Sequence, residues 1–152
     1  MTSRTTLLDL ARRVGEATGR DRELDAWIWN HLGHTEGDDA EIAWRKHLPM
    51  GPKEIVQGQT MAAAIEQFPN DLAGIARSWN VPPLTASIDA ALALVEKTIG
   101  SAYWPAIVHK ALSALSEKHY WPVTPFSSHE QLREFPIAIL AALIAAKLED
   151  TP

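Results

Sequence analysis

The stretch PLTASIDAALALVEKTIG, residues Pro83 to Gly100, has the clearest periodic pattern in this sequence. Its larger apolar residues recur at the i, i+4, i+7, i+11 spacing of one helical face: Ile88, Leu92, Val95 and Ile99. Either Thr85 or Ser87 can cap the first turn, and Gly100 provides a stop. The stretch therefore predicts an amphipathic helix with one buried face.

Helical spacing continues on both sides of this stretch, in residues 6–19, 21–33, 60–79 and 105–119. A last helix is predicted to begin at Pro136, and from Ile137 to Ala146 it is apolar on nearly every side. A helix without a polar face has to be surrounded by other elements. We therefore predict a mainly α fold, in which residues 1–152 form one compact domain around a buried C-terminal helix.

The segment 34–59 departs from helical spacing and is predicted to be irregular. Its HTEGDDAE stretch is acidic and turn-prone, and its LPMGPK stretch contains two prolines and a glycine. Between them, residues Glu41 to Leu48 fit either a short strand or a helical turn. An α+β fold with a short two-stranded element in the middle of the chain is the alternative.

The composition limits the classes of function. The chain has 152 residues, no cysteine and a net charge of -5, so we expect no disulfide, no thiolate-bound zinc and no general nucleic-acid binding. The apolar run at the C-terminal end is about half of the roughly 20 residues that span a bilayer. We therefore expect a cytoplasmic protein that does not enter a membrane.

Three segments, in this order, resemble small proteins of unassigned function from phages and prophages, mainly of alphaproteobacteria, related to the phage ABA-sandwich domains. They are RDRELDAWIW (residues 20–29), LTASIDAALALVEK (84–97) and PIAILAALIAAKL (136–148). Members of that group carry strand-like sequence between the second and third segments, where this chain has the helical PAIVHKALSALSEKH. The resemblance implies a phage or prophage origin and the cytoplasm of a host cell, and it implies no catalytic residues.

A metal site is conceivable at one place. His31 and His34 stand at i, i+3 and are followed by Asp38, and imidazole and carboxylate groups are ordinary ligands of zinc and manganese. His31 also lies on an apolar helical stripe, which favours a histidine at the edge of a core. No nucleophile elbow and no phosphate-binding loop occurs in the sequence. We expect no bound metal, no cofactor and no catalytic activity, with a small metal-dependent hydrolase or nuclease as the alternative.

The tryptophans are numerous for this length, six in all, and two Tyr-Trp pairs flank one predicted helix. Aromatic rings beside cations can stack on a base or anchor a protein interface, and they can also simply fill gaps between helices. The candidate binding residues are Trp29, Trp44, Arg45, Lys46, Tyr103, Trp104, Tyr120 and Trp121.

These observations favour a phage accessory protein that binds rather than catalyses. It would act as a counter-defence factor, either by occupying a host protein or by sequestering a small nucleotide-like signal. A homodimer is expected because apolar helices of small domains often pair about a two-fold axis. A structural or assembly protein of the phage particle is a further alternative.

Overall fold

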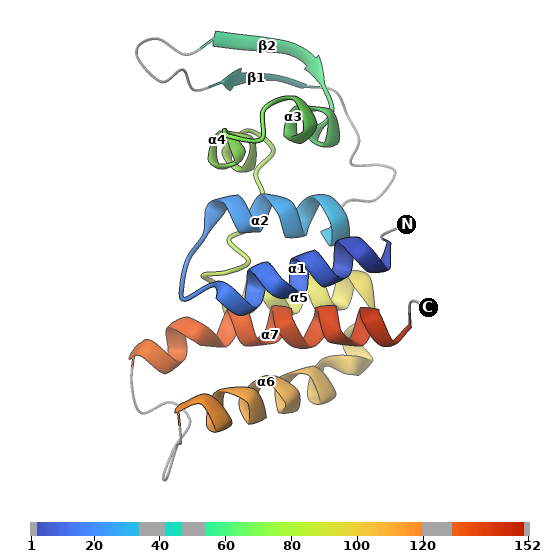
Figure 1. The fold of residues 1–152 in the computed structure, drawn as a ribbon, viewed down its shortest axis with the longest axis vertical. Helices are drawn as coiled ribbons and strands as arrows, with labels where there is room; N and C mark the ends of the chain where they lie inside the picture. The colour runs from blue at the N-terminus through green and yellow to red at the C-terminus, as the bar shows by residue number, and fades with distance from the viewer. Residues whose placement is uncertain (1–2, 34–41, 47–53, 120–128, 151–152) are drawn as a thin grey trace. The chain divides into compact units, whose positions relative to one another are not determined.

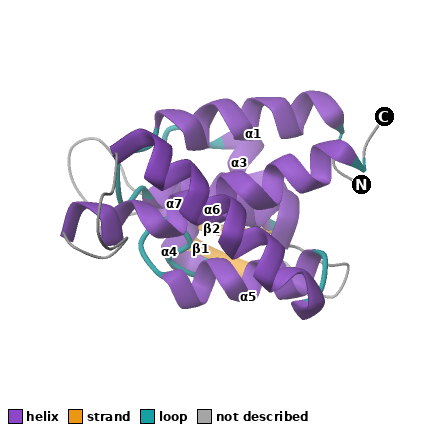
Figure 2. Ribbon diagram, turned by 90° about the horizontal axis from the view of Figure 1, so that it is seen from below, coloured by secondary structure: helices purple, strands orange, loops and turns teal. Residues whose placement is uncertain are grey.

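The computed structural model describes residues 3–33, 42–46, 54–119 and 129–150. Helix dominates these residues, and their strands form one two-stranded sheet (Figure 2). The prediction of a mainly α fold is therefore confirmed. The chain forms two compact units: unit 1 holds residues 1–21 and 83–152, and unit 2 holds residues 22–82. The expectation of one domain over residues 1–152 stays a prediction.

Unit 1 is built around its C-terminal helix. Its elements are α1 (Arg4–Glu16), α5 (Ile88–Thr98), the short 3-10 helix η3 (Ser101–Tyr103), α6 (Trp104–His119) and α7 (His129–Glu149). Helix α7 packs against α1, α5 and α6, and Figure 1 shows it between α1 and α6. Its fully buried residues are Ile139, Leu140, Leu143 and Ile144. The central position predicted for this helix is confirmed within unit 1.

The start of α7 differs from the prediction. The helix begins at His129, and Pro136 lies inside it rather than at its first position. Proline lacks the N–H that a helix interior uses, but its fixed φ is compatible with helical backbone. The flanking residues Phe135 and Ile137 are both buried, so packing holds the helix through the proline. The preference of proline for the first position of a helix takes no account of such packing, so it does not predict where α7 begins.

Helix α5 forms where the sequence predicts it, with a different buried face. Ser87 is the N-cap, and its hydroxyl accepts the backbone N–H of Ala90 at 3.1 Å. The buried residues are Ala91, Leu94 and Val95, whereas the predicted stripe residues Ile88, Leu92 and Ile99 are only half-buried. The large apolar residues of this helix occupy more than one face, and packing against α7 selects among them.

Thr85, the other candidate cap, has a different role. Its side chain is fully buried, and its hydroxyl accepts the backbone N–H of Asp21 at 2.8 Å and donates to the Asp21 carbonyl at 3.3 Å. Asp21 and Pro83 are the points where the chain leaves unit 1 and returns to it. A single threonine therefore joins the two segments of unit 1 at this crossing.

Unit 2 contains short elements. They are α2 (Arg22–Ile28), the π-helix η1 (Trp29–Gly33), β1 (Ile42–Lys46), β2 (Glu54–Gln59), α3 (Met61–Gln67) and α4 (Leu72–Ser78). Helix α4 packs against α2, α3 and β1. The core of this unit consists of Ala26, Met61, Ala64, Ile65, Leu72, Ile75, Ala76 and Val81. Four partly buried aromatic residues pack against it: Trp27, Trp29, Phe68 and Trp79.

The middle of the chain contains a hairpin rather than only irregular structure. Strands β1 and β2 are antiparallel, with Trp44 paired to Val56 and Lys46 paired to Glu54, and the register shifts between Ile42 and Trp44. The strand alternative for residues 41–48 is therefore the right one for Ile42–Lys46. Strand β2 lies in the segment 34–59 that is predicted to be irregular, and with β1 it forms the short two-stranded element given as the alternative. Strand β2 is short and has a glycine, so its sequence alone carries little strand signal, and pairing with β1 supplies the missing hydrogen bonds.

Arg22 joins the two ends of unit 2. It donates through Nη1 to Oδ2 of Asp25 at 2.9 Å and through Nη2 to the carbonyl of Val81 at 2.8 Å. The Asp25 side chain is fully buried, and that of Arg22 keeps 25% of its surface exposed. The first turn of α2 is thereby fixed to the segment that leaves the unit.

None of the helices in the described ranges is long and apolar enough to cross a membrane.

Candidate functional site

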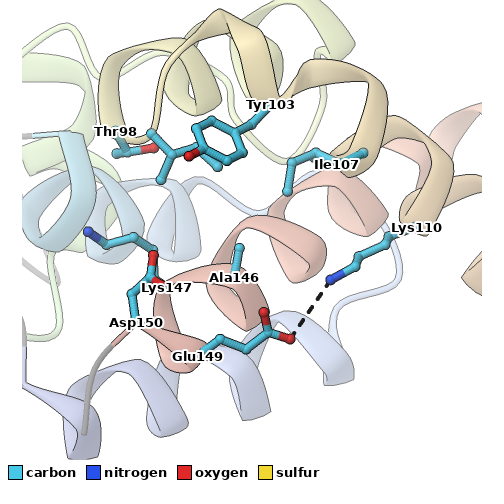
Figure 3. Close-up of a pocket in the computed structure, with 10 residues that line it drawn as sticks. Thr98, Tyr103, Ile107, Lys110, Ala146, Lys147, Glu149 and Asp150 are labelled. Carbon is cyan, nitrogen blue, oxygen red and sulfur yellow. Dashed lines mark ion pairs between the residues drawn. The ribbon is translucent and has the colours of Figure 1, made fainter.

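A cavity of about 430 Å³ opens in unit 1, where the C-terminal ends of α5 and α7 meet η3 and the first half of α6. This volume is within the range of small-molecule sites. The lining residues are Thr98, Ile99, Tyr103, Ala106, Ile107, Lys110, Ala146, Lys147, Glu149 and Asp150. Figure 3 shows Ala146 on the α7 wall between two groups of charged side chains, with Tyr103 and Thr98 facing it from the other wall.

The turn after α5 puts Tyr103 at the cavity. The backbone N–H groups of Ile99 and Gly100 both donate to the Val95 carbonyl and end the helix. Gly100 has φ of 100°, a conformation that side chains with a Cβ rarely adopt, and the chain turns there into η3. Tyr103 is left 56% exposed, whereas the other large hydrophobic rings whose burial the structure describes are half-buried or buried. The cavity thus has an accessible aromatic wall.

Charged side chains of both signs line the opening. The ammonium of Lys110 lies 3.9 Å from Oε1 of Glu149, with 52% of the lysine side chain and 73% of the glutamate side chain exposed. An ion pair this long and this exposed holds its members only weakly. Lys147 and Asp150 lie on the other side of Ala146 (Figure 3). The opening therefore offers both hydrogen-bond donors and acceptors to a ligand.

Two contacts fix the walls. Nη1 of Arg4 donates to the Leu148 carbonyl at 3.0 Å, which ties the last turn of α7 to the start of α1. The hydroxyl of Thr98 donates to the Leu94 carbonyl at 2.7 Å. Since that proton is already engaged, the Thr98 oxygen can only accept a hydrogen bond from a molecule in the cavity.

Of the predicted binding residues, Tyr103 alone is shown to line this cavity. Trp104 follows it in the chain but is half-buried, and its indole Nε1 is buried. The predicted pair is therefore divided, with one ring at the cavity and the other directed inward. Tyr120 and Trp121 lie outside the described residues.

The remaining predicted binding residues belong to unit 2. Trp44, Arg45 and Lys46 lie in β1, which packs against α4. Trp29 begins the π-helix η1 and packs against the core of unit 2. A Cβ added to Gly33 would come within 2.2 Å of the Trp29 ring, so the ring covers that glycine. The packing role of Trp29 is clear, and a binding role for these four residues stays a prediction.

The alternative metal site falls mostly outside the described residues. His34 and Asp38 both lie there, and His31 is in η1. The His31 ring stacks on that of Trp27, with ring centres 5.6 Å apart and planes at 9°. Within the ranges that the structure describes, no group of three or more histidine and acidic residues is arranged to hold a metal ion.

Sequence reasoning did not identify the charged residues of the cavity. A signal for one wall exists, since Tyr103, Ile107 and Lys110 stand at i, i+4, i+7 and so share a helical face. The opposite wall comes from the last turn of α7, more than thirty residues further along the chain. Nothing in the sequence indicates that these two faces meet.

Comparisons with protein-family models, with curated proteins and with solved structures found no match for this chain. The candidate site is therefore defined by the geometry of this chain.

Proposed function

We propose that this chain is a phage or prophage accessory protein that binds a small nucleotide-like ligand in the cavity of unit 1 and does not catalyse a reaction. Binding would sequester a signal of the host, which is a counter-defence role. The phage setting is supported by the resemblance of three sequence segments to phage and prophage proteins. The binding role is supported by the cavity.

One observation carries the proposal: an exposed aromatic ring, Tyr103, forms one wall of a cavity of about 430 Å³. Folding normally covers large rings, and a ring left open beside a cavity is available for stacking. Every nucleobase has a flat π face, so any of the bases can stack on an aromatic side chain. The half-buried residues Ile99 and Ala146 add apolar surface that a flat ring system can cover.

The polar groups of the cavity suit recognition by hydrogen bonding. They are the ammonium groups of Lys110 and Lys147, the carboxylates of Glu149 and Asp150, and the phenol of Tyr103. Such groups fix the orientation of a ligand whose ring is already held by apolar contact.

The test is isothermal titration of the full-length protein with a panel of nucleosides and of linear and cyclic nucleotides, using two substitutions of Tyr103. Tyr103→Phe keeps the ring, and Tyr103→Leu removes it. If the ring stacks on the ligand, Tyr103→Leu should weaken binding about 5- to 150-fold, the equivalent of about 1–3 kcal/mol for one base. Tyr103→Phe should retain most of the affinity.

Leu8→Ala is the matched control, because Leu8 is another large apolar side chain that is exposed, at 51%, and it lies on α1 away from the cavity lining. We expect this variant to bind as the unmodified protein does. Flat titrations across the whole panel would refute the proposal. Equal binding by Tyr103→Leu and the unmodified protein would refute the site.

A further inference from the structure

We infer, on the basis of the proposed function, that the cavity recognises the uncharged ring end of its ligand, a base or nucleoside, and that phosphate groups add no affinity.

The side chains of the cavity lining are balanced in charge. Lys110 and Lys147 contribute two positive charges, and Glu149 and Asp150 contribute two negative charges, so their sum is zero. Sites that bind phosphates concentrate lysine and arginine or present the N-terminal end of a helix. Here, the Lys110 ammonium lies 3.9 Å from a carboxylate oxygen of Glu149. A phosphate approaching Lys110 would also approach Glu149, and the repulsion would offset the attraction.

The ends of three helices lie at the cavity, two of them C-terminal. Helix α5 ends at Thr98 and helix α7 ends at Glu149, and both of these residues line the cavity. The C-terminal end of a helix carries roughly half a negative charge. One helix N-terminus, that of α6 at Trp104, lies beside Ala106 and Ile107 and supplies the opposite sign. Two C-terminal ends lie here with one N-terminal end, and Arg4 offsets part of the charge at the α7 end by donating to the Leu148 carbonyl. The helix ends by themselves therefore do not make an anion site.

The hydrogen-bonding groups suit a ring that carries N–H donors. Glu149, Asp150 and the Thr98 oxygen are acceptors, the last because its proton is given to the Leu94 carbonyl. The distance of 3.9 Å between Lys110 and Glu149 is longer than a hydrogen bond. Glu149 can therefore turn to a ligand without breaking a direct hydrogen bond. Amino groups and ring N–H groups of bases donate hydrogen bonds that such carboxylates can accept. Phosphate oxygens are acceptors only and cannot bond to a carboxylate in this way.

The geometry thus points to a nucleoside held between Tyr103 and α7, with Glu149 accepting from the edge of the base and the 5′ end directed to solvent. Lys110 and Lys147, at the opening, would donate hydrogen bonds to acceptor atoms of the base and the sugar. The uncharged nucleoside should bind at least as tightly as its phosphorylated forms.

Titration of the full chain with adenosine, guanosine and their 5′-mono- and triphosphates tests this inference. We expect at least one nucleoside to bind, and its Kd should stay constant or increase as phosphates are added. Glu149→Gln should weaken nucleoside binding several-fold because an amide presents one acceptor where the carboxylate presents two. Glu117→Gln is the control, since Glu117 is an exposed glutamate on α6 that does not line the cavity.

The outcomes separate the two proposals. A Kd that falls with each added phosphate, and rises with added salt, would overturn the preference for the uncharged ring and leave the proposed function in place. Nucleoside binding that Glu149→Gln leaves unchanged would overturn the role of Glu149. Absence of binding by every nucleoside and nucleotide would overturn both the inference and the proposed function.

Discussion

The two units of this chain make a core in different ways. Unit 1 has one 21-residue helix, α7, with aliphatic side chains such as Leu140 and Ile144 fully buried among neighbouring helices. Unit 2 has α2, α3 and α4, of seven residues each, around a cluster that includes Ala64 and Ile75. Three tryptophans and a phenylalanine pack at the edge of that cluster.

The difference has a physical origin. A helix of seven residues is too short to be stable alone in water, and it offers few positions for apolar side chains. Each tryptophan buries more area than an aliphatic side chain, so a few of them compensate for the short helices. A long helix with apolar residues on all sides does not need this compensation. The surplus of tryptophan in the sequence is therefore explained in part by the construction of unit 2.

The largest effects should follow from cavities made in either core. Leu140→Ala in unit 1 and Ile75→Ala in unit 2 each remove a fully buried side chain, and each should lower the free energy of unfolding by about 2–5 kcal/mol. Denaturant titration followed by tryptophan fluorescence and by far-UV circular dichroism measures both. Since Trp27, Trp29 and Trp79 report on unit 2, Ile75→Ala should move the fluorescence transition more than Leu140→Ala does.

If Leu140→Ala and Ile75→Ala each shift the fluorescence transition and the circular-dichroism transition by the same amount, the contrast between the two units is contradicted. The two units would then unfold as one cooperative structure, as expected for a single domain.

A smaller effect should follow from removing the cation that pairs with Asp25. Arg22→Met takes away the guanidinium that lies 2.9 Å from a fully buried carboxylate and that also donates to the Val81 carbonyl. We expect a loss of about 3 kcal/mol, the lower end for breaking a buried ion pair, because Arg22 is 25% exposed. The loss should appear in the fluorescence transition of unit 2.

Arg20→Met is the control for this substitution, since Arg20 is an exposed arginine two positions earlier. It should change stability by less than about 0.5 kcal/mol. An equal loss in the two variants would mean that the Arg22 contacts do not stabilise unit 2.

The smallest effect belongs to the surface of α1. Hydrogen bonds from Arg12 and Arg13, at 2.9 Å and 2.8 Å, lower the pKa of Asp9 below its ordinary value of 3.8. Because the folded pKa is lowered, the stabilisation is present above about pH 4 and is lost as the pH falls through the folded pKa. Asp9→Asn should therefore lower Tm slightly at pH 7 in dilute buffer.

The Tm difference between Asp9→Asn and the unmodified protein should shrink in about 1 M salt and vanish in strong acid, since these ion pairs are exposed. A difference that is independent of both salt and pH would show that the charge of Asp9 is not its cause.

The sequence predicts the helices well because periodic apolar positions depend on local order. Thr60 and Ser87 are caps that can be recognised from the residue pattern alone, and the apolar run 137–146 correctly indicates the centre of unit 1. The start of α7 and the partner of β1 are not local properties. Pro136 is tolerated because of what packs around it, and β2 exists because β1 is beside it.

The cavity was less predictable than the fold. Tyr103 was a candidate because it belongs to an aromatic pair, but its partner Trp104 turns inward. Lys110 and Glu149 are ordinary surface residues in the sequence, and they approach one another only after α6 packs on α7. A site built from two helix faces distant in sequence is invisible to motif analysis.

We propose that unit 1 folds without residues 22–82 and that the proposed binding cavity, whose lining lies in unit 1, needs no residue of unit 2. Its two segments are joined at Asp21 by the hydroxyl of Thr85, so residues 22–82 can be replaced by a short glycine linker between Asp21 and Pro83. We predict that this shortened protein is helical, unfolds in one cooperative thermal transition, and binds the nucleoside with a Kd within about twofold of that of the full chain. Loss of the cooperative transition, or a folded protein that no longer binds, would contradict the account.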